Sequence, residues 1–114
     1  MEADETRLAS RCGTCPTPTT RRAECVVQVD NASVRVTEWR FTAGSSTGHH
    51  RHDYDYVVVP LTTGRLLIRS AEGKAPGELA AGQAYFRRSG VEHEVVNDNA
   101  FEIAFAEIEL KGNA

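Results

Sequence analysis

Three features that would each place the chain in a large class of proteins are missing from the sequence. It has no apolar run that approaches the ~20 residues of a membrane span, so we expect no membrane partner. It has no excess of positive charge, because 13 basic residues face 16 acidic ones and the net charge is −3. This balance argues against a nucleic acid as the main partner, which would need a basic patch. It also lacks an N-terminal apolar stretch like that of a secretory signal, which favours a cytoplasmic location.

Cysteine is scarce and odd in number, being limited to Cys12, Cys15 and Cys25. An odd count does not give a disulfide framework. Cys12 and Cys15 have the C-x-x-C spacing of redox and zinc sites, but a structural zinc site needs about four ligands and only Cys25 is left to add. We therefore interpret the pair as part of an oxidisable tail and assign it no function.

The remaining chain is organised as one domain, which is what 114 residues allow. Residues 1–22 read as a flexible tail, since prolines, threonines and an arginine pair occur there without a sustained hydrophobic period. Residues 23–114 read as short strands separated by turns, and Pro76-Gly77 is one of the expected turns. The expected strands are 25–29, 34–41, 54–61, 65–70, 84–87, 93–96 and 101–110. This spacing is typical of an all-β sandwich or barrel.

Three of the four histidines fall where two strands can bring them together. Residues two apart share a face of a strand, so His50 and His52 can point at one ion, and His93 and Asn97 share a face in the same way. Imidazole is the commonest metal ligand near neutral pH. If the two strands lie side by side, His50, His52 and His93 converge inside the fold.

The same two segments carry the spacing of the two sequence motifs of the cupin superfamily, which the chain resembles over residues 34–110. The matching positions are Gly44, His50, His52 and Gly64 in the first motif and Gly82, Gly90, His93 and Asn97 in the second. The string from His50 to Thr62 is similar to a branch of small bacterial cupins often named after beta-alanine degradation. The resemblance implies a single-domain, RmlC-like double-stranded β-helix, or jelly-roll barrel, and a homodimer.

Two positions depart from the family pattern. Val57 stands where a glutamate ligand is usual, five residues after His52, and Arg88 stands in place of a proline. The first change leaves a three-histidine set around one divalent ion, with Fe, Zn, Mn or Ni as candidates. Three neutral imidazoles leave the charge of the ion uncompensated and leave coordination positions open, which favours Lewis-acid chemistry.

Other residues near the histidines are candidates for supporting roles. Tyr54, Asp55 and Tyr56 follow His52 and could handle protons, although packing or a solvated turn accounts for each of them as well. Asn97 is a candidate hydrogen-bond partner of a ligand, and its alternative role is that of a turn residue.

Arg40 and Arg88, together with Arg87, are the cations expected near the pocket. Arginine binds carboxylates through bidentate hydrogen bonds, so a small anionic metabolite is one interpretation. A solvated strand face is the other interpretation.

Two functions follow, and the sequence separates them poorly. The first, which we favour, is a metal-dependent enzyme of the dioxygenase, isomerase or decarboxylase type that acts on a small molecule. The second is a non-catalytic module that binds or senses a small ligand. A homodimer is expected in either case, because Ile103 and Phe105 lie on one face of the last strand whereas Ile108 and Leu110 lie on the other.

Overall fold

The computed structural model describes residues 21–112, and within this range the secondary structure consists of strands and turns. No helix among these residues is long and apolar enough to cross a membrane. Nine strands are formed: β1 Glu24–Asp30, β2 Val34–Phe41, β3 His50–Arg51, β4 Asp55–Pro60, β5 Gly64–Ser70, β6 Gly73–Leu79, β7 Tyr85–Arg87, β8 Glu92–Asn97 and β9 Ile103–Leu110. The predicted all-β class is confirmed, whereas the predicted tail over residues 1–22 lies almost wholly outside the described residues.

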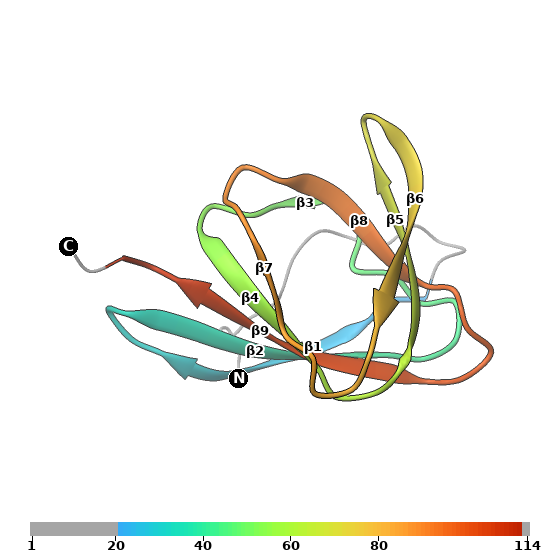
Figure 1. Cartoon of the computed structure of the whole chain (residues 1–114), viewed down its shortest axis with the longest axis horizontal. Coiled ribbons are helices and arrows are strands. Elements are labelled where there is room, and N and C mark those ends of the chain that lie inside the picture. The colour runs from blue at the N-terminus through green and yellow to red at the C-terminus, as the bar shows by residue number, and fades with distance from the viewer. Residues whose placement is uncertain (1–20, 113–114) are drawn as a thin grey trace.

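The strands form two antiparallel sheets that face each other (Figure 1). One sheet has the order β1-β2-β9-β4-β7 and the other has the order β3-β8-β5-β6. Sequence neighbours are therefore often separated in space, since β4 lies between β9 and β7 and β8 lies between β3 and β5. This arrangement brings β3 and β8, which are far apart in the sequence, side by side in the same sheet, with His50 opposite His93.

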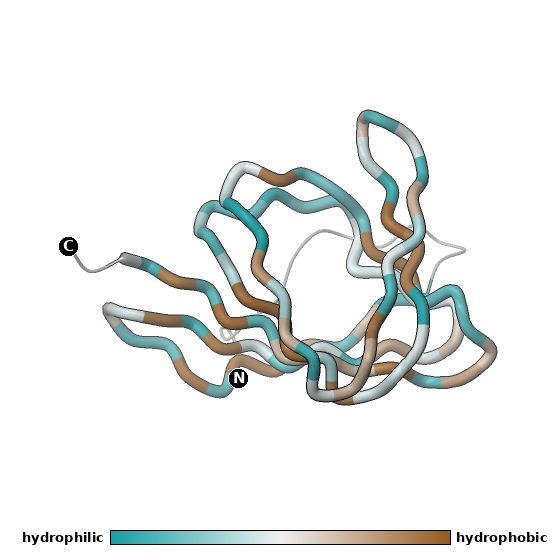
Figure 2. The backbone as a smooth tube through the Cα atoms, in the orientation of Figure 1, coloured by the Kyte–Doolittle hydropathy of each residue, from teal (hydrophilic) through white to brown (hydrophobic). Residues whose placement is uncertain are grey.

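The core lies between the sheets and is filled by the inward-facing residues, which are every second residue along a strand. Apolar and polar residues alternate along the strands (Figure 2), which is the pattern of a sheet with one buried face. In β4 the inward set is Tyr56, Val58 and Pro60, and Val58 is only 3% exposed. Phe41 and Phe105 meet across β2 and β9 with ring centroids 5.5 Å apart.

The prediction of a turn at Pro76-Gly77 is wrong, because both residues lie within β6. Pro76 pairs with Leu67 of β5, and β6 is an edge strand of its sheet. Proline is tolerated on an edge strand because its missing N–H can face away from the neighbour. At Gly77 a Cβ would come within 3.1 Å of the Ile68 side chain, so the close approach of β5 favours glycine there.

Cys25 lies on β1 and packs against the core, and it is disulfide-bonded. The prediction for Cys12 and Cys15 concerns positions outside the described residues.

Candidate metal centre

The structure brings the three predicted histidines together at one end of the space between the sheets. His50 on β3 pairs directly with His93 on β8, and His52 follows β3 by one residue. The Nε2 atom of His52 lies 3.1 Å from the Nε2 atoms of both His50 and His93. The potential ligand atoms of all three lie within 4.8 Å of one another.

Local backbone contacts hold the imidazoles in this arrangement. The Nδ1 atom of His50 lies 3.0 Å from the carbonyl oxygen of Gly48, to which it can donate a hydrogen bond. That bond fixes the tautomer and leaves the Nε2 lone pair directed at the other histidines. The main chain of His52 is held on both sides, since its N–H donates to Val91 and its carbonyl oxygen accepts from Gly90.

Burial makes the three imidazoles neutral at physiological pH. Desolvation, followed by repulsion from the other histidines, lowers the pKa of His52 to about 3 and that of His93 to about 4. Burial lowers the pKa of His50 as well. Neutral imidazole is the form that binds metal ions, so the cluster is ready to bind without first losing protons.

The spacing of the nitrogen atoms fits a single bound ion. Two ligands that each lie about 2.1 Å from an ion are separated by about 3.0–3.4 Å in octahedral or tetrahedral geometry. The two Nε2–Nε2 distances of 3.1 Å fall in this range. A hydrogen on the Nε2 atom of His52 could be donated to only one of its two neighbours, whereas one cation between the rings would serve all three nitrogen atoms. The residues therefore suit a divalent metal ion.

Tyr56, and not Val57, occupies the inward position of β4 beside the cluster. The Tyr56 ring stacks on the His52 ring with centroids 4.0 Å apart, and Tyr56 is 3% exposed. Val57 points to the opposite face of the sheet, because successive strand residues alternate. The expectation that position 57 faces the ion is corrected accordingly: a carboxylate at Val57 would not reach the histidines.

A carboxylate that the sequence analysis missed lies next to the cluster. The Oε2 atom of Glu107 on β9 is 3.7 Å from the Nε2 atom of His52, and its side chain is only 12% exposed. Burial, and then the charge of Glu109, raises the pKa of Glu107 to about 7, while a hydrogen bond from the Trp39 side chain opposes this shift. The signal was present in the sequence, since Glu107 shares the parity of the inward residues Ile103 and Phe105.

The other predicted supporting residues do not face the cavity, apart from Tyr56. Asp55 accepts a hydrogen bond of 2.8 Å from the backbone N–H of Ser89 and so holds the turn after β7. Tyr54 lies in the bend between His52 and β4, outside the cavity lining.

Asn97 is also placed differently from the prediction that it would bond to a histidine. Its side-chain amide donates to the carbonyl oxygens of Phe41, Thr42 and Phe101, at 3.1, 3.2 and 2.8 Å. Its Oδ1 atom accepts from the N–H of Asn99 at 2.8 Å. Asn97 is 1% exposed, and its role is to fasten the end of β2 to the β8–β9 connection.

Of the three candidate arginines, Arg87 lines the cavity and Arg40 and Arg88 do not. Arg40 forms an ion pair of 2.8 Å with Glu38 on the outer face of β2. Arg88 follows the end of β7, and its guanidinium lies 5.7 Å from the centre of the outward-facing Phe86 ring. Arg40 and Arg88 thus agree with the other interpretation, a solvated face, and Arg87 is the arginine that lines the cavity.

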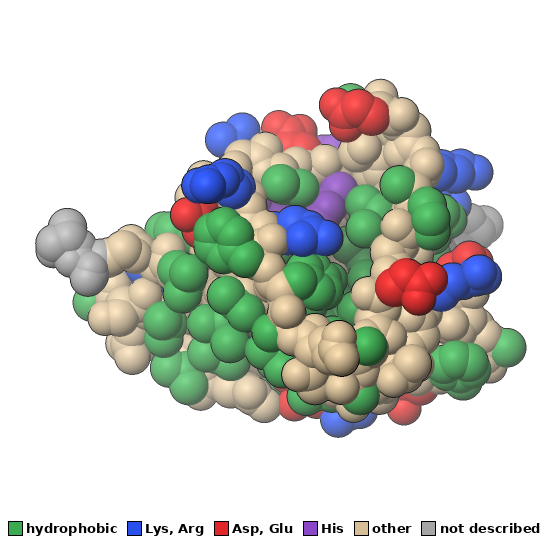
Figure 3. Space-filling view, viewed as in Figure 1, with side chains coloured by type: hydrophobic (Ala, Val, Ile, Leu, Met, Phe, Trp, Pro, Cys, Tyr) green, Lys and Arg blue, Asp and Glu red, His purple; other side chains and the backbone are tan. Residues whose placement is uncertain are grey.

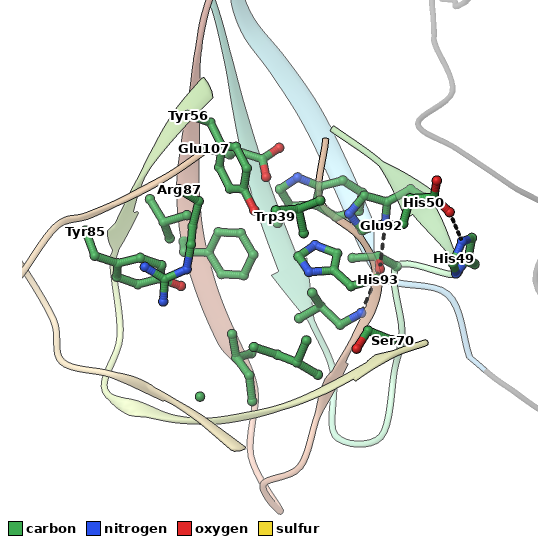
Figure 4. A pocket seen from close by; sticks show the side chains of 18 of the residues that line it. Trp39, His49, His50, Tyr56, Ser70, Tyr85, Arg87, Glu92, His93 and Glu107 are labelled. Atoms are coloured by element: carbon green, nitrogen blue, oxygen red, sulfur yellow. Dashed lines mark hydrogen bonds and ion pairs between the residues drawn. The ribbon is translucent and has the colours of Figure 1, made fainter. Parts of the chain in front are cut away.

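The histidines open into a cavity of about 840 Å³ between the sheets. Its walls are largely apolar, and the surface is hollowed above the histidines (Figure 3). Tyr85 and Arg87 lie on one side of it, and His50 and His93 lie on the other (Figure 4). An apolar cavity with a few convergent polar groups is typical of a small-molecule site.

No protein-family model matches the chain. Over 85 residues it is 61% identical to the Beta-alanine degradation protein BauB of Pseudomonas aeruginosa, and the match covers 75% of this chain and 90% of that protein. A crystal structure of a cupin domain from Bordetella pertussis is 50% identical, with a TM-score of 0.81 over 82% of this chain and 98% of that chain. The chain belongs to the cupin superfamily.

A more distant cupin shows how far the fold extends beyond sequence similarity. An RmlC-like cupin with a double-stranded β-helix fold from Methanocaldococcus jannaschii is 10% identical, with a TM-score of 0.66 over 90% of this chain and 92% of that chain. The predicted jelly-roll cupin fold and the resemblance to the branch named after beta-alanine degradation are confirmed.

The choice between Tyr56 and Val57 as the inward position can be tested with a carboxylate at each. Tyr56→Glu should raise the affinity for added Zn²⁺ at least about tenfold, or ~1.4 kcal/mol, because the new carboxylate lies against His52. Val57→Glu should leave the affinity unchanged. The measurement is a zinc titration against a chromophoric chelator, with Tyr56→Gln as the uncharged control. If Val57→Glu bound zinc more tightly and Tyr56→Glu did not, position 57 would face the ion, as the family spacing implied.

Proposed function

We propose that this cupin is a metal-dependent enzyme that acts on a small molecule in the cavity between the sheets. The ion is held by the Nε2 atoms of His50, His52 and His93. The observation that carries the proposal is the convergence of three neutral imidazoles, two of whose Nε2–Nε2 distances are 3.1 Å, at the end of a largely apolar cavity. Three protein ligands are the usual number in catalytic metal sites, which keep a position open for water or substrate.

The bound ion would supply Lewis acidity, or oxygen chemistry if it is iron, which supports a dioxygenase, isomerase or decarboxylase type of reaction. The chain supplies the groups around the open position. Glu107, held by Trp39, has a pKa near neutrality and can hold or accept a proton beside His52. Tyr56 keeps its proton, because burial raises its pKa above the usual value, and its hydroxyl can therefore donate.

The relative's name suggests the metabolic setting. The protein from Pseudomonas aeruginosa is named for beta-alanine degradation, and we propose that the present chain acts on a small metabolite of that kind of route. The alternative is a non-catalytic module that binds a small ligand at the same ion, and turnover by the metal-loaded protein separates the two.

The metal ligands can be tested by single substitutions. His50→Ala or His93→Ala should reduce metal affinity by more than the roughly 10–100-fold that a hydrogen-bond partner of a ligand is worth, because each removes a ligand outright. The readout is the metal content of protein prepared without a chelator or histidine tag and then reconstituted, measured by mass spectrometry.

The matched control is His49→Ala, which removes the neighbouring histidine whose side chain is 64% exposed and lies near Glu92. Wild type and this variant should each bind about one ion per chain. Unchanged metal content in both His50→Ala and His93→Ala would show that the histidine cluster is not a metal centre.

We also propose that the outer face of the five-stranded sheet pairs with a second copy of the chain. Direct cross-strand partners lie on one face of a sheet, and an unbroken apolar row crosses all five strands. The row consists of Val29, Val36, Ile108, Val57 and Phe86, on β1, β2, β9, β4 and β7. The two ends of the row are the most exposed to solvent, since Val29 is 42% and Phe86 46% exposed. In addition, β1 is an edge strand that another strand can cover.

Val29→Lys should convert the dimer into a folded monomer, because it places a charge within the apolar row at a position where an isolated chain would tolerate it. Light scattering coupled to gel filtration measures the mass. Phe101→Lys, which changes an exposed phenylalanine outside the row, should leave the dimer intact. A monomeric wild type, or a Val29→Lys variant that stays dimeric, would contradict the proposed interface.

A further inference from the structure

Arg87 is the one lysine or arginine among the described residues that line the cavity. It is the last residue of β7, and its guanidinium lies 4.4 Å from the centre of the Tyr85 ring. A guanidinium stacked on an aromatic face is held by cation–π attraction and dispersion. The cavity wall thus carries a single, oriented positive charge opposite the histidine cluster (Figure 4).

The guanidinium of Arg87 has donors to spare. Its Nη1 atom donates to the backbone carbonyl of Phe86 at 2.9 Å, and no ion pair joins it to a carboxylate of residues 21–112. Each of the other arginines on the strands forms an ion pair with a carboxylate. These are Arg35, Arg40, Arg51, Arg65 and Arg69. Arginine carries five N–H donors, so Arg87 can accept an anionic partner that the chain itself does not provide.

Arg87 and two of the histidines, His50 and His93, line the same cavity. A ligand bound in this cavity therefore shares it with both Arg87 and the histidines. The cavity lining also includes the apolar side chains of Val58, Leu66 and Val95, which suit an aliphatic chain.

The balance of charge favours a monocarboxylate over a phosphate. One guanidinium matches one carboxylate, in the bidentate geometry that the two planar groups share. A phosphate dianion would meet the same single cation in a cavity whose lining also contains four acidic residues, namely Glu72, Glu78, Glu92 and Glu107. Burial raises the pKa of Tyr85, so its hydroxyl stays a neutral donor and adds no negative charge.

We propose that Arg87, stacked on Tyr85, binds the carboxylate of a small aliphatic carboxylic acid and directs the opposite end of that molecule toward the histidine cluster. The carboxylate subsite stands on the geometry of β7 alone, and only the role of the opposite end rests on the proposed metal centre. The substrate class is thus a short monocarboxylic acid whose reacting group lies away from its carboxylate.

The test is a titration of propionate into metal-free protein, followed by ligand-detected NMR, so that direct binding of the carboxylate to a metal ion cannot contribute. Arg87→Gln should raise the Kd for propionate at least about tenfold, because a charge-assisted hydrogen-bond pair is lost. Arg87→Lys should give an intermediate Kd, since the charge remains and the planar fork is lost. Arg88→Gln, which changes the neighbouring outward-facing arginine, should leave the Kd unchanged.

Propionamide is the matched neutral probe, and its weaker binding should not respond to Arg87→Gln. The proposal is overturned if wild type shows no saturable binding of propionate, if Arg87→Gln binds it as well as wild type does, or if inorganic phosphate binds more tightly than propionate. Arg87→Gln should retain the metal content of wild type. Arg87-dependent propionate binding by a protein that takes up no metal would contradict the proposed metal centre and leave the carboxylate subsite standing.

Discussion

The pairing of β3 with β8 is the contact on which the functional site depends. It joins His50 directly to His93, and it does so with one of the shortest strands of the fold. The two-residue strand is held less by its own ladder than by its flanks, where the Gly48 carbonyl lies 3.0 Å from the His50 imidazole and the main chain of His52 bonds to the 90–91 turn. A slip of one residue in the pairing of β3 with β8 would turn an imidazole to the opposite face of the sheet. The register of this pairing therefore determines whether the three histidines meet.

Bringing the histidines together buries several polar groups in one place, which is electrostatically unfavourable. Three imidazoles are packed where desolvation and mutual repulsion keep them neutral, and a carboxylate at Glu107 is buried beside them. Polar groups of this kind are costly in an apolar cavity unless a partner satisfies them. A divalent ion at the proposed centre would satisfy the imidazole lone pairs and offset the negative charge of the carboxylate, whereas Arg87 places a separate positive charge across the cavity. In the proposed function, the metal end of the cavity would carry the chemistry and the Arg87 end would bind the carboxylate.

Period-two alternation predicted those parts of the site that lie on regular strands, and failed where other forces act. It predicted that His50, His52 and His93 would converge once their strands lay side by side, and alternation within β4 turns Tyr56 inward and Val57 outward. Tyr54 has the parity of His52 but lies in a bend that interrupts the strand, so parity does not apply to it. The interpretation of Asn97 as a turn residue agrees with the bond that it accepts from the Asn99 N–H, whereas its bonds to residues 41 and 42 join segments that the sequence does not show to be neighbours. The strand β6 was missed because Pro76 and Gly77 are also turn formers, and an edge position tolerates them.

In the proposed metal centre, His50, His52 and His93 bind one ion through their Nε2 atoms. The most direct measurement is X-ray absorption spectroscopy of the metal-loaded protein, which counts imidazole ligands and gives their distances. The account predicts three imidazole nitrogens at about 2.0–2.1 Å if the ion is zinc. A spectrum with one imidazole or none, from protein that binds one ion per chain, would place the ion elsewhere and contradict the account.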